Sequence, residues 1–182
     1  MNDQDARQIK RRSIRLKDHD YRNPGAYFVT ICSYKSECLF GSVKHDRVLL
    51  SKLGQIVERN WHCTGRKREN VDLDVHMVMP NHFHGVIIIR EWEGQSKVVS
   101  MKRSGRTGEQ FGAPTADSIP SIIRAFKSSV TKAINEYRST PGRQVWQRGF
   151  YDHVVRNEEE LNRIRDYILT NPARWPFVHC RL

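Results

Sequence analysis

The chain of 182 residues carries 31 lysines and arginines against 20 aspartates and glutamates. The resulting formal charge of +11 indicates a polyanionic partner, most often a nucleic acid. An anionic membrane surface is the weaker alternative, because no membrane-spanning apolar run, signal peptide or lipidation motif stands out, and we expect a cytoplasmic, nucleoid-associated protein.

Residues 1–23 are expected to form a basic arm in front of a single domain over 24–182. Five of its basic residues lie close together and are candidates for contacts to phosphates: Lys10, Arg11, Arg12, Arg15 and Lys17. The alternative is a solvated tail without a partner. The cysteines are scattered without a Cys-x-x-Cys pair, which argues against a zinc ribbon or a disulfide framework.

The first half of the domain shows one helical and three strand patterns. The stretch 26–34 is rich in aromatic and β-branched residues and predicts a strand, and 51–61 has apolar residues at helical spacing. The stretches 71–79 and 82–89 both predict strands. Because only Pro80 and Asn81 separate them, we expect an antiparallel hairpin.

A loop rich in glycine and basic residues follows over 91–118. It is expected either to close over nucleic acid or to be an insert of no consequence. Three of its basic residues are candidates for contacts to DNA: Lys102, Arg103 and Arg106.

The second half predicts a helix over 119–138 with Ser118 as N-cap, and then a strand or hairpin edge over 145–156. A capping box at Asn157 begins a last helix, which should end at Asn171-Pro172. The order β, α, ββ, α, β, α predicts an α+β fold, a ferredoxin-like two-layer sandwich with an antiparallel central sheet.

Two histidines stand one residue apart at the start of the predicted strand over 82–89. Side chains alternate along a strand, so His82 and His84 share one face and Phe83 points to the other. Two imidazoles on one face can chelate a divalent cation. The alternative is one histidine hydrogen-bonded in the core and one at the surface.

Tyr167 falls beside the apolar stripe of the last predicted helix, so its hydroxyl can face a cleft. Asn171 follows one turn later on the same face. A nucleophile and a polar ligand one turn apart can both reach a metal held by the histidine pair. The alternative, which these residues by themselves favour, is a boundary tyrosine with Asn171 as a C-terminal cap.

Three segments in this order resemble one family: RRSIRLKDHDYRNPGAYFVTICSYKSECLFG, MPNHFHGVIII and WQRGFYDHVVRNEEELNRIRDYILTNPARW. They are similar to the REP-associated tyrosine transposases, relatives of insertion-sequence transposases within the HUH single-strand endonucleases. The resemblance covers nearly the whole chain, and the loop over 91–118 is least matched.

The resemblance implies an HUH endonuclease fold and a role for each candidate residue. It makes His82 and His84 the metal ligands, Asn171 the third ligand and Tyr167 the nucleophile. The implied cofactor is Mg²⁺ or Mn²⁺. The implied activity is nicking and joining of single-stranded or hairpin-forming repeated extragenic palindromic DNA through a 5′-phosphotyrosine link, by a monomer or homodimer.

Two other functions stay open: a hairpin-DNA-binding regulator with little or no cleavage, and a metallohydrolase that uses an activated water. His76 and His153 are interpreted as structural. Arg148 is a candidate DNA contact. Trp146, Phe150 and Tyr151 are interpreted as core residues, and Trp146 is the choice if any of the three stacks on bases. Asp152 is a candidate for a residue that hydrogen-bonds a metal ligand without touching the metal itself.

Overall fold

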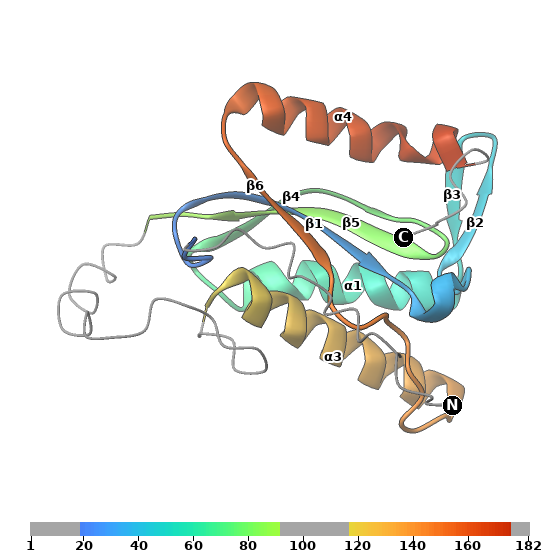
Figure 1. Cartoon of the computed structure of the whole chain (residues 1–182). Helices are drawn as coiled ribbons and strands as arrows, with labels where there is room; N and C mark the ends of the chain where they lie inside the picture. Colours follow the sequence, from blue (N-terminus) through green and yellow to red (C-terminus); the bar gives the residue numbers. More distant parts are fainter. Residues whose placement is uncertain (1–18, 92–116, 176–182) are drawn as a thin grey trace, which may run out of the picture.

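The computed structural model describes residues 19–91 and 117–175, which form a four-stranded sheet with helices on both faces (Figure 1). Neighbouring strands pair antiparallel in the order β4-β5-β1-β6, namely β4 (Val71–Val78), β5 (His82–Ile89), β1 (Gly25–Cys32) and β6 (Tyr151–Val155). The basic residues predicted to contact DNA over 10–17 and 102–106 lie outside the described residues.

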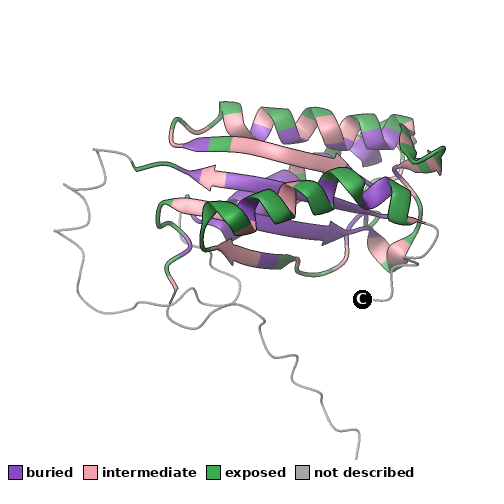
Figure 2. Cartoon of the chain, turned by 90° about the horizontal axis from the view of Figure 1, so that it is seen from above, coloured by how far each residue is buried: buried purple, intermediate pink, exposed green. Residues whose placement is uncertain are grey.

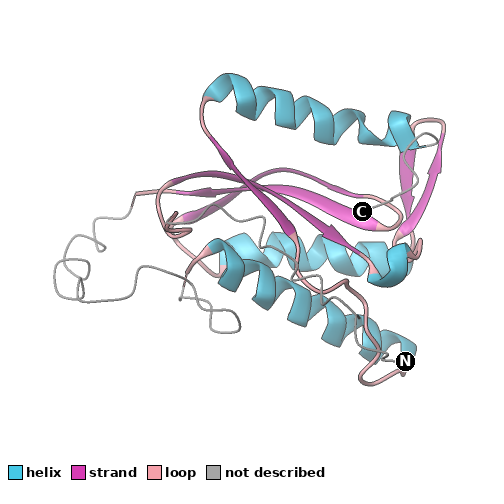
Figure 3. Cartoon of the chain, viewed as in Figure 1, coloured by secondary structure: helices cyan, strands magenta, loops and turns pink. Residues whose placement is uncertain are grey.

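Among the described residues, α-helices cover both faces of the sheet, two on one face and one on the other (Figure 1, Figure 3). α1 (Lys52–Arg66) and α3 (Ile119–Arg138) pack together, and α4 (Glu158–Arg174) lies opposite them. Without α4, the order β-α-β-β-α-β is the ferredoxin-like arrangement, which confirms the predicted α+β fold. α4 adds a third layer to the predicted two.

Each face of the sheet has its own core, because side chains alternate along the strands. The larger core, shared with α1 and α3, includes Val29, Ile31, Trp61, Phe83, Ile87, Ile123, Phe126 and Val130. The smaller core beneath α4 consists of Phe28, Val86, Leu161 and Ile168. Figure 2 shows the central strands largely buried and the outward faces of the helices exposed. Burying one leucine or isoleucine contributes about 1.5–3 kcal/mol, so Leu161 and Ile168 hold α4 on the sheet.

A β-bulge in β4 changes which side chains face α1. The pairing with β5 shifts between Leu73 and His76. Asp74 and Val75 both lie on the α4 side, since Asp74 bonds Arg165 of α4 and Val75 packs against the smaller core. His76 therefore lies on the α1 side, where its ring is 6.3 Å from that of Trp61.

Gly85 in β5 is required by close packing. A Cβ there would lie 2.6 Å from the Trp61 ring and 2.9 Å from the Phe83 ring. Neither ring can move away easily, because both are fully buried. The absent side chain thus makes room for an aromatic ring of α1 under the strand that carries the histidines.

Two features differ from the sequence-based predictions near the ends of elements. α4 was expected to end at Asn171-Pro172 but continues to Arg174, which makes that prediction wrong. A proline in the last turn removes one backbone hydrogen bond, and the burial of Asn171 and Pro172 offsets this loss. The predicted strand over 145–156 is regular only from Tyr151 to Val155, with one isolated bridge between Ser33 and Trp146 before it.

A short hairpin between β1 and α1 was not predicted. β2 (Gly41–Lys44) pairs with β3 (Arg47–Leu50), and β3 contacts α4. The turn between β2 and β3 contains His45 and Asp46, whose φ angles are 49° and 58°. Both are left-handed positions at which glycine or asparagine is the usual signal, so the turn has no clear sequence signature. Among the described residues, none of the helices has the length and apolar character that a membrane crossing requires.

Candidate active site

His82 and His84 lie on the α4 face of β5 and point toward each other. Their Nε2 atoms are 3.0 Å apart. Each residue is 4% exposed, so both rings are buried in the space between the sheet and α4. The predicted alternation of the His-x-His motif therefore brings two ring nitrogens to one point.

The ring of His82 is oriented by the residue that precedes it. Its Nδ1 is 2.7 Å from Oδ1 of Asn81, and Nδ2 of Asn81 donates to the backbone carbonyl of Ser36. That second bond fixes the amide with its oxygen toward the ring, so Nδ1 of His82 carries the proton. Nε2 of His82 then keeps its lone pair and is directed toward His84.

His84 is oriented by the neighbouring strand. Thr30 is its cross-strand partner in β1, and the Thr30 hydroxyl is 2.8 Å from Nδ1 of His84. Phe28 stacks on the same ring with centroids 5.5 Å apart. A hydroxyl can donate or accept, so Thr30 supports either tautomer of His84, including the one with a free lone pair on Nε2.

Burial keeps both imidazoles neutral. It lowers the pKa of His82 to about 4, against an opposing hydrogen bond with Asn171. The pKa of His84 falls to about 3, first through burial and then through the proximity of His82. Neutral imidazole is the form that binds a metal ion, so at neutral pH both rings are in the ligand state without first losing a proton.

Asn171 enters the same site from α4. It is 4% exposed, and its Nδ2 is 3.5 Å from Nε2 of His84. Rotating the amide by half a turn brings Oδ1, an oxygen ligand, to the same place. The C-cap of α4 is Trp175, so the alternative of Asn171 as the helix cap does not apply.

Tyr167 lies one turn before Asn171, at the open side of the site. Its ring centroid is 5.3 Å from that of His84 and 6.1 Å from that of Phe28, to which it is perpendicular. The residue is 39% exposed, in contrast to the buried histidines. The structure thus brings the four predicted site residues together, with the tyrosine accessible to a large substrate.

Two polar contacts fix α4 over the sheet. Arg165 donates to one Asp74 oxygen from Nε at 3.0 Å and from Nη2 at 2.6 Å, which holds the helix to β4. Glu160 pairs with His153 of β6 at 2.9 Å, and a backbone hydrogen bond from Arg156 is the first cause of its lowered pKa. Only Arg156 and Asn157 separate β6 from α4. His153 therefore has the structural role expected of it.

Two other candidates, Trp146 and Asp152, lie on the face of the sheet opposite the histidines. Trp146 is buried with its ring 4.9 Å from that of Phe40, which confirms it as a core residue and leaves it unable to stack on bases. Asp152 pairs with Val29 in β1 and lies on the same face of the sheet as Val29. The histidines lie on the other face, so Asp152 cannot hydrogen-bond them. Arg148 is exposed in the segment before β6.

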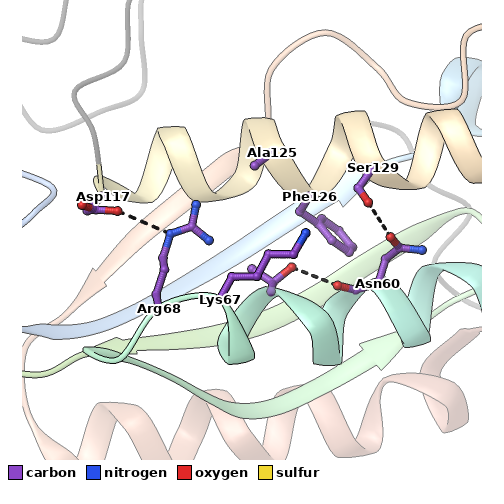
Figure 4. A pocket seen from close by; sticks show the side chains of 8 residues that line it. Asn60, Lys67, Arg68, Asp117, Ala125, Phe126 and Ser129 are labelled. Carbon is purple, nitrogen blue, oxygen red and sulfur yellow. Dashed lines mark hydrogen bonds and ion pairs between the residues drawn. The ribbon is translucent and has the colours of Figure 1, made fainter.

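A hollow between α1 and α3 lies on the opposite face of the sheet (Figure 4). It has a volume of about 200 Å³, and its walls include Asn60, Lys67 and Arg68. The Ser129 hydroxyl donates to Oδ1 of Asn60 at 2.6 Å, and Arg68 pairs with Asp117. The first bond connects the two helices, and the second joins the segment after α1 to the segment before α3. The hollow therefore belongs to helix packing and is separate from the candidate active site.

Sequence reasoning did not find Asn81 and Thr30, which orient the two histidines. Asn81 stands directly before His82, and a hydrogen-bonding side chain beside a candidate ligand is a usable signal. Thr30 has no such signal, because its position depends on the register between β1 and β5.

The chain is 37% identical over 166 residues to an uncharacterised protein of Haemophilus influenzae, covering 91% of this chain and 89% of that protein. Its structure is similar to that of a REP-associated tyrosine transposase bound to a REP hairpin, with a TM-score of 0.58 and 20% identity, over 91% of this chain and 75% of that chain. No protein-family model matches. The structural likeness confirms the fold that the sequence motifs indicated.

Proposed function

The chain belongs to one family with the Haemophilus influenzae protein and has the fold of a REP-associated tyrosine transposase, and from this premise we propose that it is a metal-dependent enzyme that nicks and joins DNA through a tyrosine nucleophile. The observation that carries the proposal is the meeting of two neutral imidazoles, one amide and one accessible tyrosine at a single point. A protein that only binds DNA has no need of this set.

The donor set fits a divalent cation. The two Nε2 atoms at 3.0 Å face each other, and their opposite ring nitrogens are bonded to Asn81 and Thr30, the supporting arrangement usual behind metal-bound histidines. When bound, a cation supplies charge neutralisation and polarisation at the scissile phosphate. Imidazole is more typical of Mn²⁺ than of Mg²⁺ sites, so we expect Mn²⁺ to support activity at least as well.

The chain's own residues account for the remaining chemistry. The Tyr167 oxygen attacks the phosphorus and gives its proton to water, and the bond from phosphorus to the 3′ oxygen breaks. The 3′ oxygen takes up a proton and leaves as a hydroxyl, while the 5′ phosphate stays linked to tyrosine. Because the phosphodiester is exchanged rather than hydrolysed, a second 3′-hydroxyl can reverse the step and join the strands without ATP.

We further propose hairpin-forming, repeated palindromic DNA as the substrate. The related structure is of a transposase bound to a REP hairpin, and the charge of +11 on this chain suits a nucleic acid. Tyr167 is accessible, whereas the side chains proposed to hold the metal are buried. The scissile phosphate therefore has to lie on a DNA strand that can leave its duplex, and the single-stranded flanks of a hairpin provide such a strand.

The experiment that tests the function uses one hairpin oligonucleotide with single-stranded flanks, labelled at the 5′ end or at the 3′ end, with protein and Mn²⁺. On a denaturing gel, the 3′-labelled fragment should migrate with the protein, and the 5′-labelled fragment should be released with a 3′-hydroxyl. Two free fragments would instead indicate a hydrolase that uses water. Binding without any cleavage would indicate a DNA-binding regulator.

Replacing Asn171 with alanine should raise the Mn²⁺ concentration for half-maximal nicking by roughly tenfold, with little change in rate at saturating metal. The reason is that the buried Asn171 amide reaches Nε2 of His84 and, once turned, offers an oxygen ligand beside the two imidazoles. The measurement is a metal titration of nicking. Thr170→Ala is the matched control, because Thr170 is exposed and bonds only within the helix. Superimposable titrations of Asn171→Ala and wild type would remove Asn171 from the ligand set.

A further inference from the structure

A second group of metal-ligating side chains lies between α1 and β4. Glu58 and His62 are four residues apart on α1 and therefore share a helix face. Their ligand atoms and that of His76 in β4 all lie within 4.8 Å of one another. Nε2 of His76 is 3.5 Å from Oε1 of Glu58, and the rings of His62 and His76 are 5.1 Å apart.

The position of His76 is set by the β-bulge. In a regular strand, residues three apart point to opposite faces, so Leu73 and His76 would be separated by the sheet. The shift between them brings both to the α1 side. The His76 ring is then stacked on Phe83, with centroids 6.1 Å apart and planes at 29°. Bulges commonly redirect a side chain toward a functional site.

We propose that Glu58, His62 and His76 form a second metal site, for Zn²⁺ or a similar first-row transition ion, on the sheet face opposite the candidate active site. Two imidazoles and one carboxylate are a ligand set typical of zinc, which leaves a fourth position for water. Mg²⁺ and Ca²⁺ favour sets made wholly of oxygen ligands.

The three side chains can close on an ion with little movement. Ligand atoms on a tetrahedral zinc lie roughly 3.4 Å apart, given bonds of about 2.0–2.1 Å. The largest separation here, 4.8 Å at most, has to shorten by about 1.4 Å. His62 is exposed and Glu58 is half-buried, so both can rotate toward the more fixed His76. Burial and the neighbouring His62 lower the pKa of His76, which favours the neutral ligand form.

Such a site connects α1 to β4 at an edge of the sheet. α1 is the helix whose Trp61 ring fills the space left by Gly85, beneath the strand with the active-site histidines. An ion that binds the folded chain and not the unfolded chain raises the melting temperature. The inference is independent of the proposed DNA chemistry, because none of the three residues takes part in it.

The test is zinc binding by the purified full-length protein. Equilibrium dialysis at about micromolar free Zn²⁺ is compared for wild type, His62→Ala, Glu58→Gln and the control His45→Asn. His45 is an exposed turn residue with positive φ, which asparagine tolerates. We expect His62→Ala to lose one equivalent of zinc and Glu58→Gln to bind that equivalent roughly tenfold more weakly. His45→Asn should match wild type.

Two further readouts separate a metal site from an ordinary ion pair. Zinc should raise the melting temperature of wild type by roughly 5 °C more than that of His62→Ala. Bound Co²⁺ should show visible absorption that His62→Ala lacks. Equal zinc stoichiometry and equal melting shifts in wild type and His62→Ala would overturn the proposal. A sulfur-to-cobalt band that disappears with His62→Ala would also overturn this ligand set, because Cys63 is adjacent.

Discussion

Replacing Tyr167 with phenylalanine should reduce DNA nicking by roughly a thousandfold or more, as expected for removal of a nucleophile. The change removes one oxygen and keeps the ring that packs against His84 and Phe28. Affinity for hairpin DNA should therefore stay within about twofold, because binding depends mainly on charge. The measurements are gel-based nicking and fluorescence anisotropy on the same oligonucleotide.

The matched control is Tyr151→Phe. Tyr151 pairs with Thr30 and so shares the face of the histidines, its ring is 6.3 Å from Phe28, and it is 40% exposed, close to the 39% of Tyr167. We expect this variant to nick DNA at a rate near that of wild type. Loss of nicking with Tyr151→Phe and its retention with Tyr167→Phe would assign the nucleophile to β6 instead of α4.

Replacing either His82 or His84 with alanine should reduce nicking by roughly 100-fold or more, since each change removes one of the two proposed imidazole ligands. Excess chelator should have the same effect on wild type. Hairpin binding should persist, because the basic surface stays intact. The measurements are single-turnover nicking and anisotropy across a Mn²⁺ titration, with circular dichroism to confirm folding.

His45→Asn serves as the histidine control here too, because it removes an exposed imidazole in the β2–β3 turn. Its nicking should equal that of wild type. Wild-type nicking that continues undiminished in excess chelator would contradict a metal role for His82 and His84, whatever the alanine variants do.

The strongest sequence patterns predicted the fold correctly. The apolar run of β5 and the helical stripe of α3 both lie where their periodicity indicated, and Ser118 caps α3 through Ser121 N–H. The β2–β3 hairpin was missed, because its strands have four residues each and its turn lacks glycine. Short strands are stabilised by tertiary contacts, here with α4, which a local pattern does not contain.

The site was predictable where it depends on local spacing. Alternation along β5 and one helical turn in α4 were enough to group His82 with His84 and Tyr167 with Asn171. The other side-chain positions depend on the register between strands and on the bulge in β4, which local spacing does not contain. Thr30 reaches His84 only through the β1–β5 register, and His76 joins α1 only because β4 is bulged.

The two-residue connection between β6 and α4 has a consequence for stoichiometry. With only Arg156 and Asn157 as a link, and with α4 held by Asp74 and His153, the helix that carries Tyr167 lies over the sheet of its own chain. On the proposed chemistry, each chain is a self-sufficient unit that can hold one DNA 5′ end at a time. An exchange that keeps two ends covalently attached at once therefore requires two copies of the chain, whereas a single copy must release the first end before it takes the second.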